Sequence, residues 1–283
     1  MNPLELVRNV RATRALLAGA PVPDGWTGSA VATQLRLARG GDRRPDGLVG
    51  ARVGPFRVTG FSASSLAYLH REIFVKLAYW FRSERPDPLV VDGGSNVGMS
   101  VLFFKALYPA ARVLAFEPAE PAHRLLVRNV EANGLARVEV HRAALGRENG
   151  EVSFYEDPDD PATFRMSTRP GRLPRARSAT VPRRRLSDFL DGPVDLVKLD
   201  VEGAEDEVLE DLVDSGTIAR VERFVVEYHH QLDPARDFLG AFVERLRSQG
   251  FHYQLSAREV VGGRAEPEPA YQDVLVYAFR RRR

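Results

Sequence analysis

The chain has no cysteine among its 283 residues. Disulfide bonds, thiolate metal sites and a cysteine nucleophile are therefore excluded. Long apolar runs are missing as well, since no stretch of about 18 apolar residues occurs, and we expect no transmembrane helix. Arginines interrupt the first apolar residues of the chain, which argues against a secretory signal peptide and favours a cytoplasmic protein.

Lysine is scarce, with three residues against 37 arginines. The formal net charge is nevertheless only +2, because 38 acidic residues nearly balance the 40 basic ones. A shift from lysine to arginine is typical of a GC-rich coding sequence, so it is weak evidence for a nucleic-acid partner. Hydrophobic residues make up 44% of the chain, which is enough for a sizeable core.

The most informative stretch lies at residues 90–98 and reads VVDGGSNVG. Its β-branched start predicts a buried strand, its glycines predict a tight turn, and the apolar residues after Gly98 predict a helix. A strand, turn and helix of this kind place backbone N–H groups and the positive end of a helix beside a ligand above the sheet. The stretch therefore predicts a nucleotide-binding site.

The spacing of the glycines discriminates among nucleotides. In the dinucleotide fingerprint G-x-G-x-x-G, the middle glycine lets a pyrophosphate approach the backbone. Here Ser95 takes that position, and the strand ends in an acid, Asp92. An acidic strand end together with Asn96 suits a ligand with a cationic head and no phosphate, and S-adenosylmethionine is such a ligand. The alternative is a glycine turn that merely joins strand to helix.

A second predicted strand, near residues 111–116, also ends in an acid, Glu117. Glu117 follows Asp92 by 25 residues. This is close to the roughly 20-residue separation at which an acid receives ribose hydroxyls in doubly wound folds. We therefore expect Glu117 to bind the ribose of the cofactor, and the small residues around Ala144 to lie against its adenine.

Strands alternate with helices from residue 86 to the end of the chain, which predicts an α/β fold with a largely parallel sheet. Five parallel strands would be followed by two strands, near 251–256 and 273–279, that pair antiparallel. This is the seven-stranded, Rossmann-like arrangement of class I methyltransferases. We assign residues 86–283 to the cofactor-binding domain.

Residues 1–85 form a predicted N-terminal extension, mainly helical, that caps or packs against this domain. Apolar spacing predicts helices near 3–19 and 64–84. Between them the composition changes to Gly, Pro, Arg and Asp, with a short hairpin predicted near 48–58.

The segment at residues 156–185 interrupts the alternation of strands and helices. From Arg165 to Arg185 it contains eight arginines and no acid. A long loop above the carboxyl ends of strands is a common place for a substrate lid. We predict that the segment closes over the acceptor substrate. Arg165 and Arg169 would then contact any acidic group that this substrate carries. A solvated arginine-rich loop is the alternative.

Three blocks of the sequence resemble those of the FkbM-type methyltransferases. They are VDGGSNVG at 91–98, FEP at 116–118 and DLVKLDVEGAE at 195–205. The resemblance covers roughly residues 70–255, and the part of the third block from Asp200 to Glu205 is the most specific. It implies an enzyme that uses S-adenosylmethionine to O-methylate a hydroxyl of a small molecule, such as a secondary metabolite or a sugar.

Carried onto this chain, the resemblance implies that the turn after the first strand wraps the methionine end of the cofactor. It also implies that Glu117 holds the ribose and that Asp200 stands beside the transferable methyl group. The expected cofactor-binding residues are Asp92, Gly93, Gly94, Ser95, Asn96, Gly98, Glu117, Ala144 and Asp200.

An alcohol is a poor nucleophile until its proton leaves, so a base or a metal ion is needed near the acceptor. We predict that His229, which follows the fifth strand close to Glu227, is this base. Asp200 is the second catalytic candidate and could take the proton itself. A divalent ion held by Asp200, Glu202 and Glu227 is the less favoured mechanism, and no metal ligand is assigned.

Two other functions compete with small-molecule methylation. A nucleic-acid methyltransferase would use the basic segment, but the Asn/Asp-Pro-Pro-aromatic signature of base N-methylation is absent after the fourth strand, where the chain reads DVEG. A non-catalytic module of the same fold would not need the polar groups of Asp200 and His229. We therefore expect a small hydroxylated acceptor, no membrane and no nucleic-acid partner, and leave open whether the protein forms a homodimer.

Overall fold

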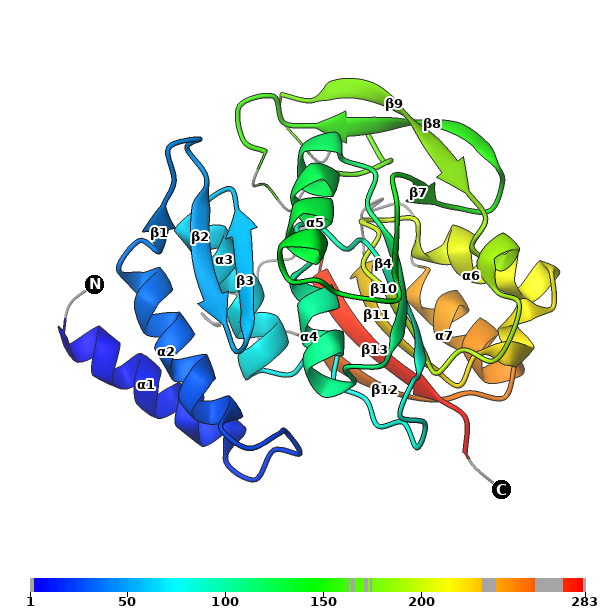
Figure 1. Cartoon of the computed structure of the whole chain (residues 1–283). Coiled ribbons are helices and arrows are strands. Elements are labelled where there is room, and N and C mark those ends of the chain that lie inside the picture. The colour runs from blue at the N-terminus through cyan, green and yellow to red at the C-terminus, as the bar shows by residue number, and fades with distance from the viewer. Residues whose placement is uncertain are drawn as a thin grey trace, which may run out of the picture.

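The computed structural model describes residues 3–161, 163, 166–170, 173, 175–230, 238–257 and 272–281. A seven-stranded sheet forms its centre (Figure 1). Its strands are β4 (Leu89–Gly93), β5 (Arg112–Phe116), β6 (Val138–His141), β10 (Leu196–Leu199), β11 (Arg223–His230), β12 (His252–Ala257) and β13 (Gln272–Phe279).

The strand order across this sheet is β12-β13-β11-β10-β4-β5-β6. The pairs from β11 to β6 are all parallel. β13 pairs antiparallel with both β11 and β12, so it is the reversed strand among those described. The predicted α/β fold, with a mostly parallel seven-stranded sheet and a terminal antiparallel hairpin, is confirmed.

Helices cover both faces of the sheet (Figure 1). They are α4 (Met99–Leu107), α5 (Glu120–Ala132), α6 (Glu205–Asp214) and α7 (Leu239–Ser248). Successive residues of a strand point to opposite faces. Val90 and Val113 therefore pack with α4 and α5, while Val91 and Leu114 pack with α6 and α7. Among the described residues, no helix combines the length and apolar character needed to cross a membrane.

The first 75 residues add helices and a small sheet beside α4 (Figure 1). The elements are α1 (Pro3–Leu17), α2 (Trp26–Ala38), β1 (Asp42–Arg43), β2 (Val49–Val53), β3 (Phe56–Gly60), α3 (Ala63–His70) and a π-helical turn at Arg71–Val75. Val53, Val58 and Phe74 share a hydrophobic core with Phe103 of α4. The extension thus packs against α4, one of the helices that cover the main sheet.

The structure corrects the prediction for this extension in two places. The helix expected over 64–84 ends in the π-helical turn at Arg71–Val75, after which Leu77 has a φ of +56°. α2 was not predicted, because Gly, Pro and Arg dominate the composition around it. Its buried positions, Ala30, Thr33 and Leu37, do follow a helical spacing. The hairpin near 48–58 is confirmed by the antiparallel pairing of β2 with β3.

The segment expected to be a loop over 156–185 is partly a strand. β8 (Gly150–Glu156) pairs antiparallel with β9 (Arg177–Arg184), and β9 pairs in parallel with β7 (Ala144–Leu145). The expected turn around Ala144 is therefore itself an edge of this second sheet. β9 has a single buried residue, Val181, so its sequence lacks the apolar alternation that marks a strand.

A buried ion pair joins the two central strands of the main sheet. The parallel register of β4 and β10 places Asp92 beside Lys198, and the Lys198 Nζ lies 3.1 Å from the Asp92 Oδ1. Lys198 also donates to the backbone oxygens of Gly93 and Gly94, at 3.0 and 2.6 Å. Burial alone would lower the pKa of Lys198, but the attraction of Asp92 and Asp200 raises it, so the amine is charged.

Replacing Lys198 with Met should destabilise the protein, because Asp92 would stay buried without its counter-ion. Breaking a buried pair from one side costs about 3–5 kcal/mol. We expect a loss of this size in the free energy of unfolding, measured with urea. The double variant Asp92→Asn/Lys198→Met removes both charges and should recover much of the loss; a double variant as unstable as K198M would contradict this account.

Candidate active site

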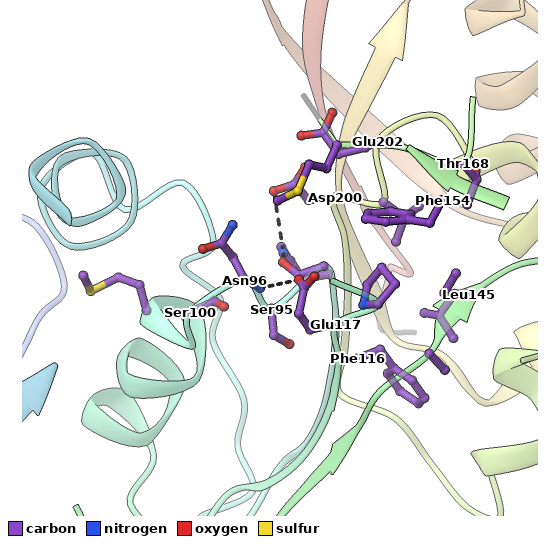
Figure 2. Close-up of a pocket in the computed structure, with 18 of the residues that line it drawn as sticks. Ser95, Asn96, Ser100, Phe116, Glu117, Leu145, Phe154, Thr168, Asp200 and Glu202 are labelled. Atoms are coloured by element: carbon purple, nitrogen blue, oxygen red, sulfur yellow. Dashed lines mark hydrogen bonds and ion pairs between the residues drawn. The ribbon is translucent and has the colours of Figure 1, made fainter. Parts of the chain in front are cut away.

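A cavity opens where β4, β5 and β10 end. It encloses about 830 Å³, its open mouth included. The wall contains Ser95 and Asn96 after β4, Glu117 after β5, and Asp200 and Glu202 after β10 (Figure 2). Because the strands are parallel, their carboxyl ends meet at one edge of the sheet, which is where ligands bind in open α/β folds.

Two glycines allow the turn after β4 to pass between the end of β10 and helix α5. Gly94 has a φ of +80°, and a Cβ added to it would lie 1.8 Å from the backbone oxygen of Asp200. Gly98 has a φ of +87°, and its added Cβ would lie 2.7 Å from the Cδ1 of Leu126 in α5. A side chain at Gly94 would therefore push the turn away from the end of β10.

Glu117 is a buried carboxylate on the cavity wall. It accepts hydrogen bonds from the backbone N–H groups of Asn96, at 2.8 Å, and Ala119, at 2.9 Å. Each carboxylate oxygen can accept a further bond, so two acceptor positions remain for a ligand. Burial raises the pKa of Glu117 to about 7, although the two backbone hydrogen bonds oppose the rise. Its charge therefore changes close to neutral pH.

Asp200 is held at the wall by two side chains. The hydroxyl of Tyr79 donates to the Asp200 Oδ2 at 3.3 Å, and the Lys198 Nζ lies 3.7 Å from the same oxygen. Burial raises the pKa of Tyr79, so it stays a hydroxyl donor. Burial also raises the pKa of Asp200, against the attraction of Lys198. The position of this carboxylate is thus fixed from the protein side.

His229 lies behind Asp200. Within the part of the chain that the structure describes, it is not one of the residues that line the cavity. Its Nε2 is 2.9 Å from the Glu202 Oε2 and 4.0 Å from the Asp200 Oδ1. Its Nδ1 is 2.8 Å from the Oε1 of Glu205. Burial alone would lower the pKa of His229, but Glu202 and Glu205 raise it well above its usual value. His229 is therefore set back from the cavity behind two carboxylates that line it, those of Asp200 and Glu202.

Most of the remaining wall is apolar, and part of it comes from the N-terminal extension. The apolar lining residues are Leu69, Ile73, Met99, Phe116, Pro118, Ala143, Ala144, Leu145, Phe154, Met166 and Val201. Leu69 and Ile73 belong to α3 and the π-helical turn that follows it. The cavity is therefore shared between the main sheet, the second sheet and the extension.

The structure brings six of the nine predicted cofactor residues to the cavity wall. They are Gly94, Ser95, Asn96, Glu117, Ala144 and Asp200. Asp92, Gly93 and Gly98 lie in the same strand and turn but do not line the cavity. Asp92 is instead directed at Lys198 and at the hydroxyl of Ser100, which donates to it.

Sequence reasoning missed Lys198 and Tyr79. Lys198 did carry a signal, because it is a charged residue between Val197 and Leu199 in an otherwise apolar strand. Tyr79 carried none, since its contact with Asp200 joins residues 121 positions apart.

The arginine-rich segment contributes to the wall through uncharged residues. Thr163, Met166 and Thr168 line the cavity. Arg169 is turned to the surface of α6, where it bonds the Glu207 Oε1 and the backbone oxygen of Gly203, both at 3.1 Å. Arg165 lies outside the described residues. A closing motion of this segment stays a prediction.

Comparison with known proteins gives the family. The model of the methyltransferase FkbM domain matches residues 92–253, more than half of the chain. "Methyltransferase 1" of Beauveria bassiana is 35% identical over 167 residues, covering 52% of this chain and 67% of that protein. "31-O-demethyl-FK506 methyltransferase FkbM" of Streptomyces tacrolimicus is 30% identical over 229 residues, covering 69% of this chain and 85% of that one.

Among solved structures, the methyltransferase FkbM of Methylobacillus flagellatus aligns with 98% of this chain at 17% identity and a TM-score of 0.46. The aligned part spans only 60% of that protein. The family assignment therefore depends on the sequence matches and on the turn, acids and sheet order described above. The chain belongs to the FkbM family of S-adenosylmethionine-dependent methyltransferases.

Proposed function

We propose that the protein transfers a methyl group from S-adenosylmethionine to a hydroxyl oxygen of a small molecule. The observation that carries this proposal is the carboxylate of Asp200, which Tyr79 and Lys198 hold at the cavity wall beside the turn after β4. The relative from Streptomyces tacrolimicus supports it, because that protein is named for an O-demethylated small molecule.

The residues of the cavity fit the cofactor. Glu117 offers a buried carboxylate with two acceptor positions for the ribose hydroxyls. Gly94 exposes backbone at the turn, and Asn96 adds an amide next to it. Phe116 and Ala144 provide apolar surface for the adenine. When bound, the cofactor supplies an electrophilic methyl group on a sulfonium.

The chain's own contribution is to hold the acceptor and remove its proton. Positioning of the acceptor oxygen can supply much of the rate acceleration of an in-line displacement. The carboxylates of Asp200 and Glu202 both line the cavity and can accept a hydrogen bond from a hydroxyl there. We infer that one of them receives its proton. His229 lies on the side of these two carboxylates away from the cavity, where it contacts both and helps to position them.

Replacing Glu117 with Ala should weaken cofactor binding, because the ribose hydroxyls lose their acceptor. A lost partner of this kind costs about 1–3 kcal/mol, or about a 5- to 150-fold rise in the dissociation constant. Calorimetry with S-adenosylmethionine measures this directly. The matched control is Glu148→Ala, since the side chain of Glu148 is 74% exposed. Equal affinities for E117A and wild type would exclude the ribose assignment.

Cofactor affinity should rise with pH between 6 and 8. Only the ionised carboxylate of Glu117 accepts hydrogen bonds on both oxygens, and its pKa is about 7. About a tenth of the molecules carry this charge at pH 6 and about nine-tenths at pH 8, so the dissociation constant should fall about 10-fold. Calorimetry at both pH values tests this. Glu117→Gln should bind the cofactor with the same dissociation constant at both pH values. If that variant kept the pH dependence of the wild type, ionisation of Glu117 could not be its cause.

Asp200→Asn should lower the rate constant for methyl transfer by about 10²–10⁴-fold, the range expected when a carboxylate that receives the acceptor's proton, or that holds the acceptor for this transfer, is lost. The assay incubates the protein with methyl-labelled cofactor and a panel of hydroxylated metabolites, including glycosides and polyketides. Label should appear on oxygen of a small molecule. A panel member that is RNA or DNA serves as the comparison, and label on nucleic acid alone would contradict the proposed acceptor class.

A further inference from the structure

Three potential metal ligands meet at the ends of β10 and β11. The register of these strands pairs Leu199 with Val226, which brings Asp200 level with Glu227. His229 is two residues further along β11 and so points to the same face as Glu227. One ligand atom from each of Asp200, Glu227 and His229 lies within 4.8 Å of the others. Ligands on opposite sides of one divalent ion are about 4–5 Å apart, so these three can share an ion.

A fourth residue fixes the orientation of the imidazole. Glu205, buried at the start of α6, lies 2.8 Å from the Nδ1 of His229. The Nε2 is hydrogen-bonded to Glu202 and faces Asp200, so a cation at Nε2 would take the place of the proton that Glu202 now accepts. A carboxylate on the far nitrogen is the usual support of a metal-binding histidine, because it sets the tautomer and raises the basicity of the ligating nitrogen. Glu205 would therefore keep the imidazole in place once a cation replaces the Nε2 proton.

The carboxylates of the cluster repel one another. Glu202 and Glu205 act unfavourably on the negative charge of Asp200, and Lys198 and His229 offset part of this repulsion. A divalent cation in place of the Nε2 proton of His229 would attract each of these carboxylates, and such an attraction is strong where water is largely excluded. The cluster thus has both the donor atoms and the electrostatic reason to bind a cation.

We propose that Asp200, Glu227 and His229 bind a divalent cation at the edge of the cavity. Two carboxylate ligands and one imidazole suit Mn²⁺ or Mg²⁺, which prefer oxygen ligands and tolerate nitrogen. The binding site stands on the geometry alone. Its use in methyl transfer rests on the proposed function.

The cation would act on the acceptor. Asp200 lines the cavity, so an acceptor hydroxyl in the cavity could reach an ion bound to Asp200. A divalent ion lowers the pKa of a hydroxyl that binds to it. The hydroxyl O–H bond then breaks and its proton passes to the carboxylate of Glu202. The oxygen's electron pair forms the bond to the methyl carbon as the carbon–sulfur bond breaks, leaving a neutral thioether. Glu202 takes this role because Asp200 is engaged as a ligand.

The test is a titration of the full chain with Mn²⁺ after dialysis against EDTA, followed by electron paramagnetic resonance, with and without S-adenosylhomocysteine. We expect loss of the free Mn²⁺ signal with one ion bound per chain. Asp200→Asn and Glu227→Gln should each raise the dissociation constant more than 10-fold. Glu205→Gln should raise it about 10- to 100-fold through the imidazole. The exposed-residue control Glu148→Gln should not change it.

A nitrogen coupling in the spectrum of the bound Mn²⁺, lost in His229→Gln, identifies the site directly. Circular dichroism would check that each variant is folded. The titration of the wild-type protein tests the proposal even if a variant fails to fold. A wild-type protein that binds no Mn²⁺ in either condition would overturn the proposal, as would binding without nitrogen coupling.

The two proposals fail separately. Bound Mn²⁺ with nitrogen coupling supports the cation site even if no hydroxylated compound in the panel is methylated. Methyl transfer that persists in excess EDTA by a protein that binds no Mn²⁺ supports the proposed function and overturns the cation site.

Discussion

The ion pair between Lys198 and Asp92 is the contact on which the candidate site depends. It joins the two central strands in the interior of the sheet, and the same amine also binds the backbone of the turn after β4. That turn presents Gly94 to the cavity, while β10 leads directly to Asp200. A contact within the protein therefore fixes the turn after β4 relative to Asp200 before any ligand binds.

Much of the fold could be predicted from sequence because its signals are local. The strand, glycine turn and helix around Gly94 occupy a few consecutive residues, and Glu117 follows its strand at a regular spacing. The partners of His229 could not be predicted in the same way. Alternation along the strand placed His229 beside the site, but its contacts with Glu202 and Glu205 arise only when β11 and α6 pack together.

Two of the elements that sequence patterns failed to reveal share a physical cause. β9 has one buried residue and exists because β8 and β7 pair with its backbone. α2 is amphipathic, yet Gly, Pro and Arg on either side obscure its pattern. In both cases stability comes from neighbours rather than from the segment itself. This also explains why the extension cannot be understood apart from the core it shares with Phe103 and the rest of α4.

The close approach of Gly94 to the backbone of Asp200 has a consequence for how this enzyme could acquire new acceptors. A side chain at Gly94 would displace the backbone that follows β10, so substitutions at this part of the cavity wall are restricted. Leu69 and Ile73 line the same cavity from the extension, and Thr168 lines it from the arginine-rich segment. These three residues lie outside the turn, so a change in their size need not move it. Substrate range should therefore diverge through these peripheral walls while the catalytic centre is inherited unchanged.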